Sequence, residues 1–336
     1  MNPKVKNFLK FILFFVASIV LFWLVYKDQD WEDLYSVLKG NVSYTWVFIS
    51  LVLNVLSNVS RAMRWQLLAK SMGYRISVAN SFMGVTIGYF ANLAIPRMGE
   101  FTRCGVISQY ENVPFPKALG TVVTERLIDI IIMLMVTLLV IATQFKQVLK
   151  FLDNNQSIKD SLYSFLHSWW VLLLGFAVVV LIIGAWKLLK NSKWKQKIAS
   201  FLQGLKEGIL TIKNVKHRGL FIFHSFFIWL MYFLGFYICF FSFEFTSQLD
   251  IFVGLTVFTL GCFGMLAPVQ GGIGAWHFMV IAGLMVYLPD VANIESLSKT
   301  FALLVHGSIT ALEILLGILC VIALPIYNAR KKCPTS

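Results

Sequence analysis

Charged and polar side chains stand in the first half of this sequence where many neighbouring residues are apolar. They are Arg61, Arg64, Asn92, Arg97, Glu100, Arg103, Glu125, Arg126 and Asp129. A charge at the centre of a bilayer costs about 2.5–3.5 kcal/mol on insertion scales, so such residues face protein or water and are typical of functional sites. Arginine suits phosphate because its planar group donates two parallel hydrogen bonds and stays ionised. The pattern therefore predicts a site that binds a lipid headgroup.

The acids of this set need cations near them. Glu125 and Asp129 are four residues apart and share one face of a helix, where they repel each other unless a cation lies close by. Arg126 is three residues from Asp129, and Arg97 or Arg103 is expected to reach Glu125 from a neighbouring element. The acids would then orient the arginines, or bind a cationic headgroup or a proton. The alternative is an ion-pair network that only holds helices together.

Two proline–glycine segments interrupt apolar runs. The first follows the run 78–95, and the second follows the run 251–267, after which the sequence is again apolar to residue 288. The breaks consist of Pro96, Gly99, Pro268, Gln270, Gly271, Gly272 and Gly274. Proline ends or kinks a helix, and backbone groups freed at membrane depth must be buried in protein or line a wet cavity. We therefore predict two re-entrant or broken helices whose breaks form facing gates of one cavity.

The composition indicates a membrane protein. Hydrophobic residues make up 58% of the 336 residues and charged residues only 13%, whereas soluble domains have about 25% charged residues. Apolar runs of about 20 residues cross the hydrocarbon core, and six occur, at 8–26, 45–62, 118–143, 168–187, 219–242 and 299–327. The predicted fold class is an all-α polytopic integral membrane protein with six full transmembrane helices and two broken regions. If both broken regions cross fully, eight or more spans result.

The distribution of charge sets the predicted orientation. The net charge is +13, and basic residues gather before residue 11, in the loop 187–218 and at the C-terminus, whereas the segment 28–33 is acidic. The positive-inside rule places the basic loop and both termini in the cytoplasm, which predicts a multi-pass protein of the bacterial cytoplasmic (inner) membrane. The first span is expected to be retained rather than cleaved as a signal peptide. Because this rule accounts for the basic residues, no nucleic-acid partner is predicted.

One repeated pattern indicates internal symmetry. A P-x-x-G sequence occurs at Pro96 and again at Pro268, 172 residues later, each time after an apolar run. Broken regions that enter from opposite faces would form an inverted repeat, a common transporter plan. We therefore treat residues 1–336 as a single transmembrane domain with halves 1–165 and 166–336.

Sequence patterns of several enzyme classes are missing. The chain has no G-x-x-x-x-G-K-[ST] loop, no G-x-S-x-G elbow and no H-E-x-x-H pair. Its cysteines and histidines are dispersed, without the spacing of a disulfide framework or a zinc site. We therefore predict no catalytic residue, no metal site and no cofactor, which favours a transporter over an enzyme.

Four segments resemble the flippase-like membrane region of the lysylphosphatidylglycerol synthases, the multiple peptide resistance factor family. They are 61–65, 92–103, 125–129 and the P-x-x-G-G-I-G run at 268–274. The resemblance covers nearly the whole chain and implies lipid translocation by a stand-alone member without the cytosolic lysyltransferase domain. That family often has a glutamate shortly after the second glycine-rich turn, where this chain has Trp276 and His277. The resemblance therefore does not extend to that acid.

Residues and resemblance together predict a lipid flippase or transporter for a phospholipid or a lipid-linked headgroup. Its partners would be membrane lipids, anionic or phosphate-bearing, and a separate lipid-modifying enzyme, while no oligomeric state is indicated. Two alternatives remain open: a membrane-embedded transferase with Glu100 or Asp129 as its base, and an accessory subunit of an aminoacyl- or glycosyl-transferring synthase. Glu313 is a single acid in the last apolar run, and it could pair with any of the arginines.

Overall fold

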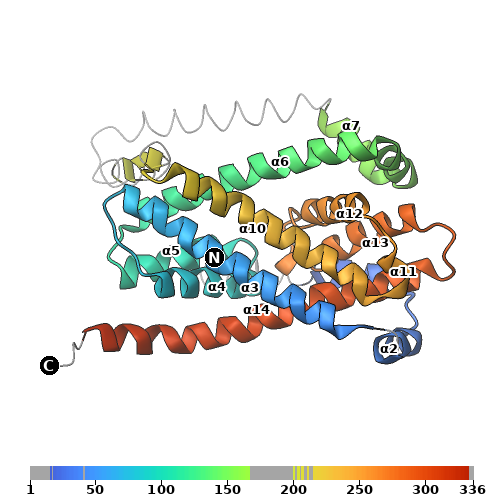
Figure 1. Ribbon diagram of the computed structural model, residues 1–336, viewed down its shortest axis with the longest axis horizontal. Helices are drawn as coiled ribbons and strands as arrows, with labels where there is room; N and C mark the ends of the chain where they lie inside the picture. Colours follow the sequence, from blue (N-terminus) through green and yellow to red (C-terminus); the bar gives the residue numbers. More distant parts are fainter. Residues whose placement is uncertain are drawn as a thin grey trace, which may run out of the picture.

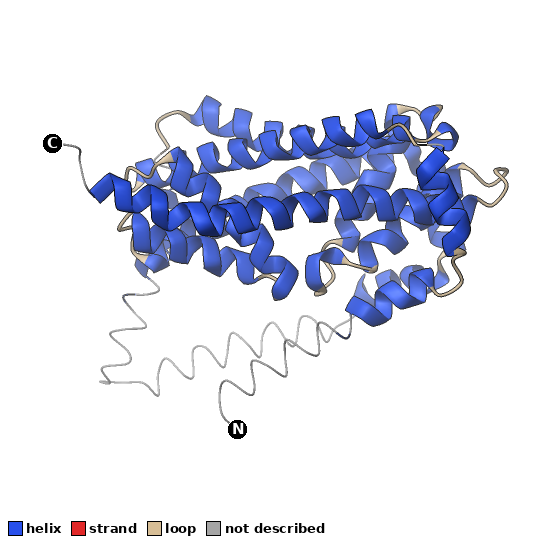
Figure 2. Cartoon of the chain, turned by 90° about the horizontal axis from the view of Figure 1, so that it is seen from below, coloured by secondary structure: helices blue, strands red, loops and turns tan. Residues whose placement is uncertain are grey.

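The computed structural model describes residues 16, 18–40, 42–166, 200, 203, 204, 206, 207, 210, 211 and 215–332. These residues are almost entirely helical and form no β-strand, which confirms the all-α class (Figure 2). The predicted span 168–187 and most of the basic loop 187–218 lie outside the described residues. The same holds for the first part of the span 8–26, of which 18–26 are helical.

Four long helices run along the long axis of the molecule (Figure 1). They are α3 (Tyr44–Ser71), α6 (Phe115–Asn154), α10 (Arg218–Ile238) and α14 (Ile294–Lys332). Each contains a stretch long and apolar enough to cross a membrane, because a helix rises 1.5 Å per residue through about 30 Å of hydrocarbon. These stretches confirm the predicted spans 45–62, 118–143, 219–242 and 299–327.

Both predicted broken regions are hairpins of two short helices. The first consists of α4 (Val78–Ala94) and α5 (Met98–Tyr110), and the second of α12 (Ile251–Gly264) and α13 (Ala275–Tyr287). The two helices of each hairpin pack against each other. Side chains cap the first helix of each hairpin: the Ser77 hydroxyl accepts from Asn80 N, and the Asp250 carboxylate accepts from the N–H groups of Phe252 and Val253.

The order of long, short, short and long helices occurs twice along the chain. The first hairpin lies between α3 and α6, and the second between α10 and α14. Figure 1 shows α4 and α5 at one end of the molecule, and α12 and α13 toward the other. The inverted repeat of the two halves stays a prediction. Short elements complete the described chain: α2 (Trp31–Gly40), α7 (Gln156–Leu166), η2 (Cys239–Ser242), α11 (Glu244–Ser247) and η3 (Gln270–Gly272).

The tips of the two hairpins touch. Gln270 Nε2 donates a hydrogen bond to the Ala94 carbonyl oxygen (2.8 Å), and Arg97 Nη2 donates to the Leu266 carbonyl oxygen (3.1 Å). Backbone groups freed at each break are thereby partly satisfied by the other hairpin. The two breaks thus contact each other, and their role as facing gates stays a prediction.

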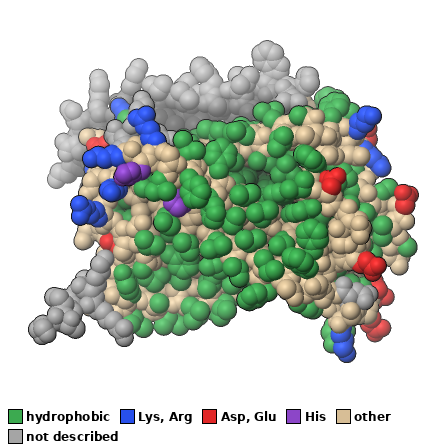
Figure 3. Space-filling model, viewed as in Figure 1, with side chains coloured by type: hydrophobic (Ala, Val, Ile, Leu, Met, Phe, Trp, Pro, Cys, Tyr) green, Lys and Arg blue, Asp and Glu red, His purple; other side chains and the backbone are tan. Residues whose placement is uncertain are grey.

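Charge separates along the same axis. Figure 3 shows an apolar belt in the middle, mostly basic side chains at one end, and at the other end acidic side chains together with a few basic ones. We call these the basic end, marked by Lys70, Arg75, Lys117 and Arg218, and the acidic end, marked by Glu32, Asp33, Asp250 and Asp290. Large apolar side chains are exposed along the middle of the long helices, as at Leu138 and Ile322. Such a continuous apolar belt is typical of a surface that faces lipid.

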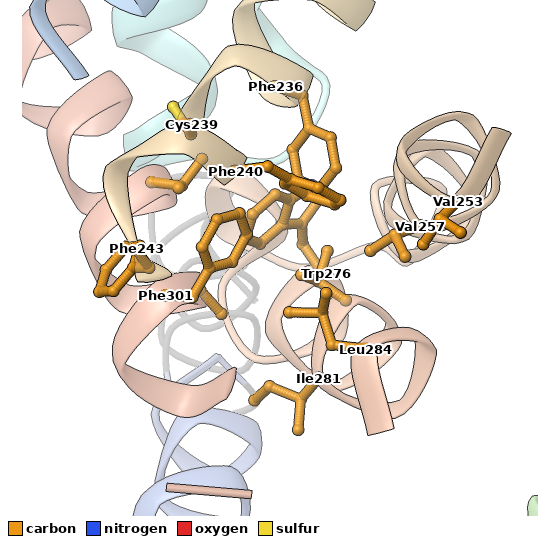
Figure 4. Packing of buried hydrophobic residues seen from close by; sticks show 13 residues of the cluster. Phe236, Cys239, Phe240, Phe243, Val253, Val257, Trp276, Ile281, Leu284 and Phe301 are labelled. Carbon is orange, nitrogen blue, oxygen red and sulfur yellow. The ribbon is translucent and has the colours of Figure 1, made fainter. Parts of the chain in front are cut away.

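Aromatic packing fixes the second hairpin. Phe240, Phe243 and Phe301 form a buried cluster with Trp276, in which neighbouring rings meet edge-on or tilted at centroid distances such as 5.5 Å for Phe240 and Phe301 (Figure 4). Aromatic pairs of this geometry add about 0.5–1.5 kcal/mol to the burial of their area. The cluster joins η2, which directly follows α10, to α13 and α14, so the second break is held at a fixed place relative to the long helices.

Candidate functional site

The structure brings ionised residues of three helices together beside the first hairpin. We call this set the arginine–carboxylate cluster. Its members are Arg61 and Arg64 of α3, Glu100 and Arg103 of α5, and Glu125, Arg126 and Asp129 of α6. The first two helices place their residues at i and i+3, so each helix presents its pair on one face.

Asp129 lies at the centre of three arginines. Its carboxylate oxygens are 2.9 Å from Arg64 Nη1, 3.1 Å from Arg61 Nη1 and 3.6 Å from Arg126 Nη1. The side chains of Arg61, Arg64 and Asp129 are all buried. An ionised carboxylate among arginines only accepts hydrogen bonds. It also neutralises buried positive charges that would otherwise destabilise the folded protein.

Glu125 forms the second centre. Its carboxylate is 2.6 Å from Arg103 Nη2, at an angle unsuited to a hydrogen bond, and 3.5 Å from Arg64 Nε. The guanidinium of Arg103 also lies over the ring of Trp65, 5.0 Å from its centroid, a cation–π geometry. Trp65 is itself fixed, because its indole Nε1 donates to Thr121 Oγ1 at 2.8 Å. Of the two arginines that the sequence analysis considered for Glu125, Arg97 and Arg103, it is thus Arg103 that reaches it.

The cluster has more positive than negative charge. Four arginines face three carboxylates, which leaves one formal positive charge in excess. Arg61 Nε, Arg64 Nη2 and Arg103 Nε are buried and have no hydrogen-bond acceptor, and both Glu125 oxygens and Glu100 Oε2 likewise have no donor. A buried N–H group without an acceptor lowers the stability of the folded protein. An anion with several oxygens would both balance the charge and accept these hydrogen bonds.

A small pocket opens onto the cluster. Its walls are Arg61, Val85, Gly88, Tyr89, Asn92, Gly99, Glu100, Arg103 and Arg126. Water-sized molecules can occupy about 20 Å³ of it, which is room for about one water. This pocket is much smaller than a lipid headgroup, so it is not by itself the headgroup-binding cavity that the sequence predicts. Arg126 has the most accessible arginine side chain of the cluster, with 41% of its surface exposed.

Asn92 and Arg97 belong to the break rather than to the cluster. Asn92 Oδ1 accepts a hydrogen bond from the backbone N of Gly99 at 2.7 Å, which ties the two helices of the first hairpin together. Arg97 has a left-handed backbone (φ 61°), is exposed, and reaches the second break instead of Glu125. Gly99 is needed at its position because a Cβ there would collide with the carbonyl oxygen of Gly88.

The residues of the second break line no part of this pocket. Gly271, Gly272 and Gly274 have positive φ angles of 57°, 77° and 83°, which glycine adopts without strain. The Gly271 carbonyl lies 2.9 Å from His306 Nε2, and the backbone N of Gly274 donates to His277 Nδ1 at 3.2 Å. Pro268 lies just before this turn, and Gln270 begins it. Gln270 also makes the hydrogen bond to the first break.

Three partners of the cluster were not predicted from the sequence. Arg61 Nη2 donates to the Tyr232 hydroxyl at 3.2 Å, which lies 2.8 Å from the hydroxyl of Tyr89. Arg64 Nη1 is 3.4 Å from Ser225 Oγ. Tyr232 and Ser225 stand in α10, where a strongly apolar run gives no sign that two polar groups point inward. In the sequence, the only indication that these two residues contact the cluster is that they are polar.

Glu313 lies apart from the cluster. Its Oε1 accepts a hydrogen bond from Asn58 Nδ2 at 3.1 Å, and no arginine within the described residues reaches it. Across 18–40, 42–166 and 215–332, histidine, cysteine and acidic side chains form no group of three or more that could hold a metal ion.

These features define a polytopic helical membrane protein with two facing hairpins and a buried ionic cluster. Residues 8–330 match the family model described as the lysylphosphatidylglycerol synthase TM region, and the chain belongs to this family. The resemblance noted in the sequence is thereby confirmed.

Two curated proteins are similar to parts of the chain. UPF0104 membrane protein MJ1595 of Methanocaldococcus jannaschii is 27% identical over 60% of this chain and 62% of its own length. Glycosyltransferase AglD of Haloferax volcanii is 23% identical over 39% of this chain and 21% of its own length. The chain thus spans less than two thirds of either relative. No solved structure matches it.

Proposed function

We propose that this protein moves an anionic, phosphate-bearing lipid headgroup between the leaflets of the membrane. The observation that carries this proposal is the excess positive charge of the cluster, together with the buried N–H groups of Arg61, Arg64 and Arg103 that lack acceptors. A phosphate supplies several oxygen acceptors and a negative charge at once. The family's name, which refers to a lipid, is consistent with this substrate class.

The carboxylates hold the arginines in place for this task. Asp129 and Glu125 contact Arg61, Arg64 and Arg103, whereas the exposed Arg126 lies 3.8 Å from Glu100 and 3.6 Å from Asp129. Arg126 is therefore the arginine that a headgroup meets first. The bonds between the breaks use only two side chains and two backbone carbonyls, so they can open to either side without disturbing the cluster.

The orientation follows from the charge at the two ends. By the positive-inside rule, the basic end faces the cytoplasm, and so do both termini of a protein in a bacterial cytoplasmic membrane. The described C-terminal end of α14 lies at the basic end (Figure 1), which supports this orientation. The first hairpin then enters from the cytoplasm and the second from outside, as alternating access requires.

A separate lipid-modifying enzyme is the proposed source of the lipid. The family name refers to a synthase and one relative is named a glycosyltransferase. Asp129 is held by three arginines and is therefore a poor base. This geometry disfavours a transferase that uses Asp129 as its base, and it does not bear on Glu100, the other base considered.

The proposal is tested by the rate at which liposomes containing the protein move fluorescent phosphatidylglycerol between leaflets. Arg126→Gln should slow this movement about tenfold, because it removes a charge-assisted contact to phosphate. The variant should fold, since Asp129 keeps Arg61 and Arg64. Lys150→Gln on the same helix is the matched control, because Lys150 is exposed and forms no ion pair within the described residues. Wild-type rates equal to those of protein-free liposomes would refute the proposal.

A further inference from the structure

A second cavity lies at the basic end, between α3, α10 and the loop that joins α3 to α4. Its volume is about 410 Å³, far more than that of the pocket at the cluster. Its walls are Met63, Gln66, Leu67, Lys70, Tyr74, Arg75, Ile76, Leu220 and His224. The α3 members recur at i, i+3, i+4 and i+7, so they form one face of that helix. We call this cavity the lateral groove.

The lining of the lateral groove changes from apolar to basic along the membrane axis. Met63 and Leu220 are 38% and 46% exposed, and with Leu67 they provide an apolar wall along α3 and α10. Lys70 and Arg75 are exposed at the basic end of the same groove. A lipid has this same gradient, with acyl chains in the apolar zone and a phosphate at the interface. Free phosphate would not need the apolar wall.

The basic part of the groove has a fixed backbone. Gln66 Nε2 donates to the Ile76 carbonyl oxygen at 2.6 Å, and the backbone N of Ser77 donates to Glu111 Oε1 at 3.0 Å. Lys117 lies 5.7 Å from the centroid of the Tyr74 ring. These contacts hold the loop on both sides of Arg75, so its side chain projects from a positioned backbone rather than from a loose loop.

Three side chains of the groove could donate hydrogen bonds to a bound anion. Lys70 and Arg75 make no ion pair within the described residues, although their charges suit phosphate. His224 is buried (5% exposed) and its Nε2 has no hydrogen-bond partner. Its Nδ1 lies 2.8 Å from Ser60 Oγ. An anion in the groove would favour the tautomer that carries the proton on Nε2.

The groove is adjacent to the arginine–carboxylate cluster. His224 lies in its wall, and the next residue, Ser225, contacts Arg64 Nη1 at 3.4 Å. Ser60, the partner of His224, precedes Arg61 in α3. Only a few side chains therefore separate a lipid in the groove from the buried arginines.

We propose that the lateral groove is a second binding site for an anionic phospholipid, which holds the lipid at the basic end before its headgroup enters the cluster. Lys70 and Arg75 bind the phosphate, and Met63, Leu67 and Leu220 contact an acyl chain. This site deepens the proposed function and rests on it, because it supplies the same class of lipid to the same cluster.

The test uses phosphatidylglycerol with a diazirine near the start of one acyl chain, photolysed with the full-length protein in liposomes. Mass spectrometry of peptides should locate adducts on Met63, Leu67 or Leu220. The double variant Lys70→Gln/Arg75→Gln should reduce these adducts about tenfold, because basic residues near the membrane surface each contribute to anionic lipid binding. Lys146→Gln/Lys150→Gln, an exposed basic pair toward the other end of α6, should leave them unchanged.

The outcomes separate this inference from the proposed function. Adducts outside the groove, with lipid movement intact, would overturn the second site and leave the proposed function standing. Adducts in the groove without lipid movement would support the site and count against transport. Excess inorganic phosphate should not reduce labelling; if it abolishes labelling, the groove binds free phosphate and the assignment to lipid is wrong.

Discussion

Asp129→Asn is expected to destabilise the folded protein by about 3–5 kcal/mol, the cost of removing one partner from a buried ion pair. Asp129 is the acid closest to both Arg61 and Arg64, at 3.1 Å and 2.9 Å. Asparagine keeps the shape but not the charge, so buried Arg61 loses its closest counterion and buried Arg64 keeps only Glu125, at 3.5 Å. Thermal unfolding of the purified protein in detergent measures the effect.

Asp153→Asn is the matched control for this variant. Asp153 also forms an ion pair, with Lys159 at 2.6 Å, but its side chain is 64% exposed. Surface pairs of this kind add little to stability, so we expect almost no change in the unfolding temperature. If Asp129→Asn were as stable as Asp153→Asn, the buried network would not hold α3 against α6.

Gly99→Ala is expected to destabilise the first hairpin by about 1–3 kcal/mol, the usual cost of overpacking, and to abolish lipid movement. A Cβ at residue 99 would collide with the carbonyl oxygen of Gly88 and come within 2.8 Å of the Asn92 amide. Because one of these contacts is backbone, α4 and α5 must separate to admit the methyl group. Unfolding in detergent and lipid movement in liposomes are the two measurements.

Gly105→Ala, on the same helix, is expected to preserve both stability and lipid movement. A Cβ at residue 105 meets no atom within 4 Å, and alanine within a helix is more stable than glycine by about 0.5–1 kcal/mol. This variant should therefore be at least as stable as the wild type and fully active. Equal behaviour of Gly99→Ala and Gly105→Ala would show that close packing across the first break is unimportant.

The sequence allowed prediction of features that depend on local chemistry. Proline removes a backbone donor and clashes with the preceding helical turn, and both breaks appear at the expected places, beside Pro96 and Pro268. The spacing of Glu125 and Asp129 placed them on one helix face, and the buried cluster bears this out. The four described long spans were likewise predicted, because length and hydropathy alone decide which helices can cross a membrane.

Pairing between helices could not be predicted in the same way. Arg126 was the expected partner of Asp129 by spacing, yet Arg61 and Arg64 lie closer because α3 packs beside α6. Arg97 or Arg103 was expected to reach Glu125; Arg103 does so, whereas Arg97, with a left-handed backbone at the break, contacts the second hairpin. These contacts depend on how helices pack in three dimensions, which residue spacing does not specify.

The most direct test of the account compares two labelled lipids in liposomes that contain the wild-type protein. One is phosphatidylglycerol and the other is a neutral glycolipid with the same acyl chains and no phosphate. Because the cluster is proposed to recognise phosphate through unpaired arginine N–H groups, phosphatidylglycerol should move about tenfold faster than the glycolipid, after subtraction of protein-free rates. Equal rates for the two lipids would contradict phosphate recognition by the arginine–carboxylate cluster.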